Sequence, residues 1–134
     1  MLRLSKRTDY GLMAMRQLSL LPRGTCRSAR AIALEHRIPP ALMAKLLQRL
    51  ARSGLVASLH GTKGGYRIAR PASQITLREV IEAIEGPVAM LECLDPCKGD
   101  CAQDESCTVK TPLHRVQERI LDTLARTHVS DLRG

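Results

Sequence analysis

The fold is decided by PALMAKLLQRLARSGLVASLHGTKGGYRIARP, residues 40–71. In its first part, up to Gly54, apolar residues recur at the period of an amphipathic helix, and glycine is a typical helix stop. The short runs VASLH (56–60) and YRIA (66–69) follow, separated by GTKGG (61–65), whose glycines tolerate the positive φ angles of a tight turn. The sequence therefore predicts a helix followed directly by a β-hairpin.

The predicted helix has an apolar side and a basic side. On a helical wheel, the Leu and Met side chains between residues 42 and 50 form one face, which is expected to be buried. The opposite face and the hairpin carry residues that are free to contact a ligand, most of them basic or polar: Ala41, Lys45, Gln48, Arg49, Arg52, His60, Lys63 and Arg67.

Two further helices are predicted before residue 40. Ser5 or Thr8 can cap the first, which ends at Pro22, and Ser28 can cap the second. The first helix is expected to pack through Tyr10, Met13, Ala14, Leu18 and Leu21. Three helices and a hairpin are the pattern of a winged helix-turn-helix, whose third helix enters the major groove of DNA. We therefore expect a mainly α fold with a small β-hairpin wing, and a DNA-binding domain over residues 1–72.

Positive charge is concentrated in the first half of the chain. Residues 1–70 carry fourteen Lys and Arg against two acidic residues, a net charge of +12, whereas residues 71–134 carry seven against eleven, a net charge of −4. A basic surface of this kind can neutralise phosphates, although it can also be a solvated surface that binds nothing. Its agreement with the basic helix face and the wing favours double-stranded DNA as the partner.

Residues 73–134 form a second region with two predicted helices. Thr76 and Glu79 have the spacing of a capping box and open the first helix, which Gly86 closes. Thr111-Pro112 begins a long amphipathic helix, which is expected to be a dimerisation element because homodimers match two-fold operators. The alternative is that this helix folds back on its own domain.

Four of the five cysteines lie in CLDPCKGDCAQDESC, residues 93–107, with the spacing C-x3-C-x3-C-x5-C. Few apolar residues are present to hold this segment by packing, and neighbouring thiolates repel one another unless they bind a cation. Zinc sites usually contain paired C-x2-C motifs, so the spacing favours an iron-sulfur cluster, while a metal-free thiol switch stays open. The fifth cysteine, Cys26, lies apart and is expected to be a partly buried residue and not a ligand.

Other classes of protein are less well supported. No signal-peptide pattern or membrane-length apolar run is present, so we expect a cytoplasmic protein without membrane contact. None of the four histidines lies in a visible Ser/Cys-His-acid arrangement, and no phosphate loop or nucleotide fingerprint occurs, so we do not expect an enzyme. An electron-transfer protein would account for the cysteines but not for the basic half.

Several motifs together resemble the Rrf-two (Rrf2) family of winged-helix regulators, and the resemblance covers nearly the whole chain. They are LRLSKRTDYGLMAM (2–15), LLQRLARSGLV (46–56), HGTKGGYRIARP (60–71), IEAIEGP (81–87) and the cysteine segment before a terminal helix. The resemblance implies a dimeric repressor that carries a [2Fe-2S] or [4Fe-4S] cluster and changes its DNA binding with the state of that cluster. The motifs around Tyr10 and at EGPVAMLEC (85–93) are most similar to the branch that regulates SUF iron-sulfur assembly genes.

The resemblance also implies a set of cluster ligands, namely Cys93, Cys101 and Cys107. Cys97 is an additional thiol and is expected to be a spare, with a fourth ligand, a replacement for Cys93 or a resolving thiol as the alternatives. Members of the IscR type use a histidine three residues after the last cysteine, where this chain has Lys110, whose ammonium group cannot coordinate iron. Members of the NsrR type use an acid early in the first helix of the partner subunit, and Asp9 stands at that place.

Overall fold

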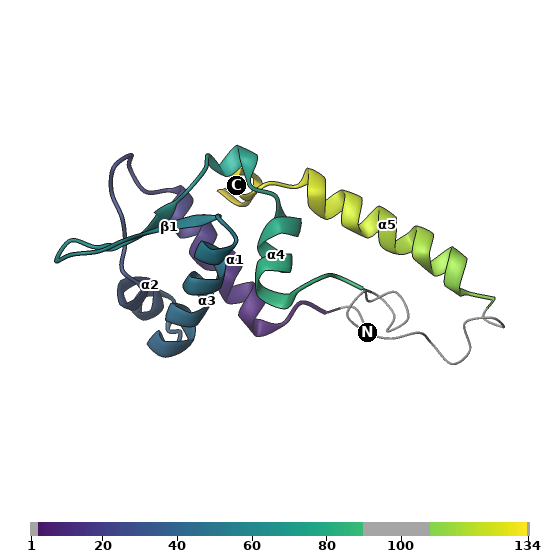
Figure 1. Ribbon diagram of the computed structural model, residues 1–134, viewed down its shortest axis with the longest axis horizontal. Helices are drawn as coiled ribbons and strands as arrows, with labels where there is room; N and C mark the ends of the chain where they lie inside the picture. The colour runs from purple at the N-terminus through teal and green to yellow at the C-terminus, as the bar shows by residue number, and fades with distance from the viewer. Residues whose placement is uncertain (1–2, 90–107, 134) are drawn as a thin grey trace.

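The computed structural model describes residues 3–89 and 108–133 of the chain (Figure 1). In chain order its elements are α1 (Lys6–Ser19), α2 (Ala29–His36), α3 (Pro40–Arg52), β1 (Val56–Leu59), β2 (Gly65–Ile68), η1 (Ala72–Gln74), α4 (Leu77–Glu85), α5 (Lys110–Arg126) and η4 (Val129–Arg133). The mainly helical fold with a β-hairpin wing is confirmed. No helix in the described part of the chain is long and apolar enough to cross a membrane.

Local capping rules set the helix boundaries. The Ser5 hydroxyl accepts a hydrogen bond from the Thr8 backbone N–H at 3.2 Å, so Ser5, and not Thr8, is the N-cap of α1. Ser28 caps α2 in the same way through Ala31, at 3.1 Å. At α4 both bonds of the predicted capping box form between Thr76 and Glu79. These short polar patterns are local in the sequence, and that is why they could be predicted.

Glu79 also holds the start of α4 to the end of the wing. Its carboxylate pairs with the guanidinium of Arg70, which continues the chain after β2. Burial raises the pKa of Glu79, but the hydrogen bonds from Arg70 and Thr76 outweigh burial, so the net effect is a pKa below the ordinary value of 4.5. The wing and the second region are therefore joined by an ionised carboxylate at neutral pH.

The core is built around the apolar face of α3. Met43, Leu46, Leu47 and Leu50 are fully buried, as the sequence predicted. They pack with buried residues of the other elements, namely Met15, Leu18, Ile32, Leu55, Val56, Ile75, Val80, Ile84 and Val129. Helix α4 packs against both α1 and α3, and the C-terminal η4 segment packs against α1.

The buried face of α1 differs from the prediction. Met13 is 38% exposed, whereas Met15 is fully buried together with Thr8, Gly11, Ala14 and Leu18. The reason lies at Gly11, because a Cβ atom at this position would come within 2.1 Å of Ile84 Cδ1 on α4. A glycine and a threonine on the buried side allow α4 to approach closely, and an apolar pattern does not reveal such a face.

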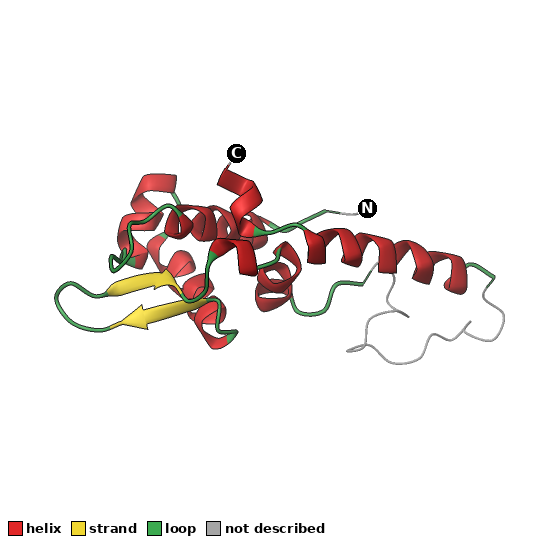
Figure 2. Ribbon diagram, turned by 90° about the horizontal axis from the view of Figure 1, so that it is seen from above, coloured by secondary structure: helices red, strands yellow, loops and turns green. Residues whose placement is uncertain are grey.

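Helix α5 lies at the opposite end of the molecule from the hairpin (Figure 2). Its first turns project away from the body, while the chain after its last turn returns to the body (Figure 1). There the Leu77 N–H donates to the Thr127 carbonyl at 2.8 Å, and the Val129 N–H donates to the Ile75 carbonyl at 2.9 Å. The C-terminal end of α5 therefore leads back to its own domain, as the second alternative predicted, while dimerisation through this helix stays a prediction.

We predict that the contact between Gly11 and Ile84 makes a larger side chain at residue 11 destabilising. Gly11→Ala should lower the free energy of unfolding by about 1 kcal/mol, because overpacking costs roughly 1–3 kcal/mol and higher helix propensity returns part of that. In an Ile84→Val background, which lacks the Cδ1 atom, the same substitution should be neutral or stabilising. Urea denaturation of the four proteins measures this, and equal effects of Gly11→Ala in both backgrounds would contradict the contact.

Candidate DNA-binding surface and its link to the cysteine segment

The solvent side of α3 is fixed by the burial of its other side. Five residues occupy it, all of them exposed: Ala41, Lys45, Gln48, Arg49 and Arg52. Three of the five are cations, and none of the first-turn residues of α3 is acidic. A helix with one face in the core and an uninterrupted polar face in solvent can lie in the major groove of B-DNA.

The hairpin presents the other candidate residues. His60, Lys63 and Arg67 are exposed, and β1 pairs with β2 in an antiparallel register from Val56–Ile68 to Leu59–Gly65. Gly61 has a φ of 110°, a conformation that side chains disfavour. The loop of the hairpin extends beyond the body of the protein, as Figure 2 shows.

The turn of the wing and the start of β2 are held to the segment before α2. Arg27 and Tyr66 exchange two backbone hydrogen bonds of 2.9 and 2.7 Å, and the Cys26 thiol donates to the Lys63 carbonyl at 3.1 Å. A Cβ atom at Gly65 would lie within 2.6 Å of the Arg27 backbone, so glycine is needed there. Cys26 is half-buried. No sequence pattern predicted this attachment, because it joins residues that are far apart along the chain.

Arg49 differs from the other cations on α3. It is exposed, but its Nη1 donates to the carbonyl oxygen of Ile84 at 2.8 Å. That carbonyl lies in the last turn of α4, where backbone acceptors are left without intrahelical donors and the helix dipole favours a cation. Arg49 thus joins the solvent face of α3 to the C-terminal end of α4.

The next residue of α4, Glu85, holds the start of α1. The Thr8 hydroxyl, which is fully buried, donates to its carboxylate at 2.7 Å, and the Ser5 hydroxyl donates to the same oxygen. The last turn of α4 is therefore the place where α1 and α3 are both bound by side chains. Sequence reasoning identified Gly86 as the end of this helix but not the two contacts that gather there.

Of the predicted cluster ligands, only Asp9 lies among the described residues. Asp9 is exposed in the first turn of α1, directly after Thr8. Lys110 is the first residue of α5 and is half-buried. Cys93, Cys97, Cys101 and Cys107 lie outside the described residues. Within residues 3–89 and 108–133, no group of three or more His, Cys, Asp or Glu side chains could hold a metal ion.

Comparison with known proteins places this arrangement in a family. The model described as "Rrf2: Iron-dependent Transcriptional regulator" matches residues 4–133. The HTH-type transcriptional regulator NsrR of Shouchella clausii is 28% identical, over 98% of this chain and 88% of its own length.

Two solved structures extend the comparison. The structure of CymR (YrzC), the global cysteine regulator of B. subtilis, superposes with a TM-score of 0.76 at 26% identity and covers 99% of this chain and 97% of that one. T. potens IscR has a TM-score of 0.75 at 25% identity and covers 98% and 85%. The chain therefore belongs to the Rrf2 family of DNA-binding winged-helix transcriptional regulators, which are not enzymes.

Proposed function

We propose that this protein is a cytoplasmic homodimeric repressor whose affinity for its operator depends on the state of the cysteine segment, residues 93–107. The observation that carries the proposal is the hydrogen bond between Arg49 and the Ile84 carbonyl. It connects the helix face proposed to bind DNA with the end of α4, and the chain runs from there into the cysteines. We propose residues 1–72 as the part that binds DNA and residues 73–134 as the part that senses and dimerises.

In this proposal α3 is the recognition helix. Lys45, Arg49 and Arg52 contact phosphates and bases, and Gln48 contacts a base edge, since its amide can both donate and accept hydrogen bonds. Ala41 leaves room for the helix to approach the groove. His60, Lys63 and Arg67 hold the wing to the neighbouring backbone. Exposure of all eight side chains supports these roles.

The chemistry of the donor set fits an iron-sulfur cluster. Cys93, Cys101 and Cys107 would hold it as thiolates, with Asp9 of the partner subunit completing the site and Cys97 as a spare or fourth ligand. The group would supply a centre sensitive to oxygen, peroxide, nitric oxide or iron shortage. Relatives named NsrR and IscR and the iron-dependent family model support a cluster, and the resemblance to the SUF branch suggests that the targets are iron-sulfur assembly genes.

A second candidate function keeps the DNA-binding half and replaces the cluster. Zinc or a metal-free thiol switch would use the same four cysteines, and similarity to a regulator named for cysteine favours keeping this alternative. In either case the segment acts on α4, because α4 is the helix that precedes it in the chain.

The proposal explains how a change at the cysteines reaches the recognition helix. The last turn of α4 is bound to α3 through Arg49 and to α1 through Glu85. A shift or tilt of this turn therefore moves the anchor of Arg49 and favours a different position of the α3 face. Asp9 follows Thr8 on α1, and Thr8 is bound to Glu85 in the last turn of α4. If Asp9 bound the cluster of the partner subunit, it would therefore also displace the last turn of α4 in its own protomer.

Dimerisation through α5 is supported by its exposed apolar residues. Val109 and Val116 are 51% and 40% exposed, and the first turns of α5 project from the body (Figure 1). A second copy of the chain would cover these side chains and set the spacing of two recognition helices along a two-fold operator.

We predict that Cys101→Ala shifts operator affinity without unfolding the winged helix. The coupling between two sites is typically worth 5- to 150-fold in affinity, so a change of roughly tenfold is expected. Anaerobic wild-type and Cys101→Ala proteins should be compared by DNA titration and by thermal melting. Affinity equal to that of cluster-loaded wild type would contradict the proposal, and stoichiometric zinc without sulfide would replace the cluster with the second candidate.

We predict that Lys63→Ala weakens binding to every DNA sequence by a similar factor. Loss of one phosphate contact in each protomer should reduce the slope of log K against log salt by about 2 for the bound dimer. Arg126→Ala, an exposed arginine in the last turn of α5 and away from its projecting first turns, is the matched control and should leave the slope unaltered. A wild-type slope in both variants would show that Lys63 in the wing does not contact a DNA phosphate.

We predict that Arg49 and Arg52 have different roles although both are exposed cations on α3. Arg52→Ala should lower DNA affinity by a similar factor in wild type and in a Cys101→Ala background. Arg49→Ala should lower DNA affinity. It should also make the affinities with and without Cys101→Ala nearly equal, because the link to Ile84 is lost. DNA titrations of the six proteins measure both ratios. An unchanged ratio in the Arg49→Ala protein would show that the link does not transmit the change.

A further inference from the structure

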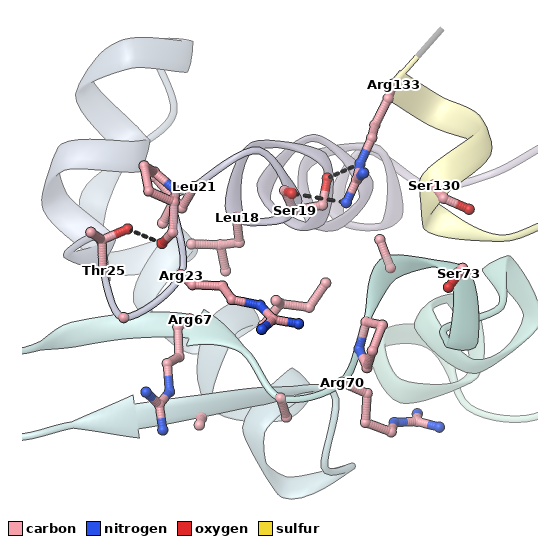
Figure 3. Close-up of a pocket in the computed structure, with 17 residues that line it drawn as sticks. Leu18, Ser19, Leu21, Arg23, Thr25, Arg67, Arg70, Ser73, Ser130 and Arg133 are labelled. Atoms are coloured by element: carbon pink, nitrogen blue, oxygen red, sulfur yellow. Dashed lines mark hydrogen bonds between the residues drawn. The ribbon is translucent and has the colours of Figure 1, made fainter.

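A cavity of about 630 Å³ lies away from the proposed recognition face. It is formed by the end of α1, the turn that follows it, the outer side of the hairpin, η1 and η4 (Figure 3). No residue of α3 lines it, and Arg67 is the single residue that it shares with the proposed DNA contacts.

Four arginines from separate parts of the chain line this cavity. Arg23 comes from the turn after α1, Arg67 from β2, Arg70 from the segment after β2, and Arg133 from η4. The lining contains no aspartate or glutamate, and it includes the hydroxyl-bearing residues Ser19, Thr25, Ser73 and Ser130. The cavity is therefore surrounded by cations and hydroxyl groups, without a carboxylate among its lining residues.

Two of the four guanidinium groups are already bound within the protein. Arg133 donates to the Ser19 carbonyl at 2.9 Å, and Arg70 pairs with Glu79. For Arg23 and Arg67, the structure shows no hydrogen bond or ion pair with any residue in its described ranges. Figure 3 shows the Arg23 side chain extending into the middle of the cavity. In the same view the Arg67 side chain runs from β2 away from Arg23, so Arg23 is the cation in the middle of the cavity and Arg67 stands at its edge.

Such a space suits an oxyanion. The planar guanidinium group presents paired donors that match phosphate geometry, and hydrogen bonds between charged groups are roughly twice as strong as neutral ones. The volume is within the range of about 300–1,000 Å³ that is usual for small-molecule sites. Arg23 and Arg67 are exposed and have no carboxylate partner among the described residues, so each is available to an anion from solution.

We propose that this cavity binds a phosphate group through Arg23, with Arg67 at its edge, either the phosphate of a small phosphorylated molecule or a phosphate of the DNA backbone beside the wing. A phosphate bound here would contact the turn after α1 and the wing at the same time, close to η4. The site would then fix the wing relative to the C-terminal end of the chain. The proposal does not depend on a cluster at the cysteines.

The first test is a titration of the full chain with inorganic phosphate at constant ionic strength, followed through backbone amide chemical shifts. Saturable shifts are expected at Gly24, Thr25 and Ser73, and Arg23→Ala should weaken binding about tenfold or more. Arg115→Ala, an exposed arginine on α5, is the matched control and should bind phosphate as the wild type does. Thermal melting should show that all three proteins are folded.

The second test separates the two sources of phosphate. If the group belongs to DNA, Arg23→Ala should reduce the salt slope of binding to duplex DNA by about 2 for the bound dimer, and inorganic phosphate should compete with DNA beyond its effect as a salt. If it belongs to a small molecule, the slope stays unchanged and Arg23→Ala loses phosphate binding alone. The proposal is overturned if Arg23→Ala matches wild type in both the phosphate titration and the salt slope.

Discussion

Met43, Leu46, Leu47 and Leu50 occupy the centre of the core, and their burial determines which side of α3 remains in solvent. Removing four large apolar side chains from water stabilises the fold by several kcal/mol, at about 1.5–3 kcal/mol for each. A rotation of α3 about its axis would expose them, so the direction of the basic face follows from packing and not from its own interactions. The wing has the same dependence, because Leu55 and Val56 leave α3 and enter this core.

The last turn of α4 is the second place on which the arrangement depends. A helix C-terminus has carbonyl groups without intrahelical partners, and one of them accepts the Arg49 guanidinium. The adjacent Glu85 accepts the hydroxyls of Ser5 and Thr8, and Gly11 brings α1 into contact with Ile84. Because these contacts share one helical turn, a displacement of that turn cannot leave α1 and α3 unaffected. This is the physical basis for linking the cysteine segment to DNA binding.

Sequence reasoning succeeded where the cause of a structure is local. Ser5, Ser28 and Thr76 cap helices within a few residues of their own positions, and the glycines of segment 61–65 form the hairpin turn. It failed where the cause is tertiary. Met13 was expected in the core because it is apolar, but α4 packs against the side of α1 that carries Gly11. The link from Arg49 to Ile84 and the pairing of Arg27 with Tyr66 join residues whose proximity only the fold creates.

The same distinction applies to the charge of the first half. A net charge of +12 counts every arginine equally, but the structure divides them. Arg27 pairs with Glu35, Arg70 with Glu79, and Arg49 with a backbone carbonyl. A cation that is already paired gains less from a phosphate, because it must give up or share its partner. The attraction for nucleic acid or another anion should therefore come mainly from cations such as Arg52, Lys63, Arg67 and Arg23, which divide between the recognition face, the wing and the cavity behind it.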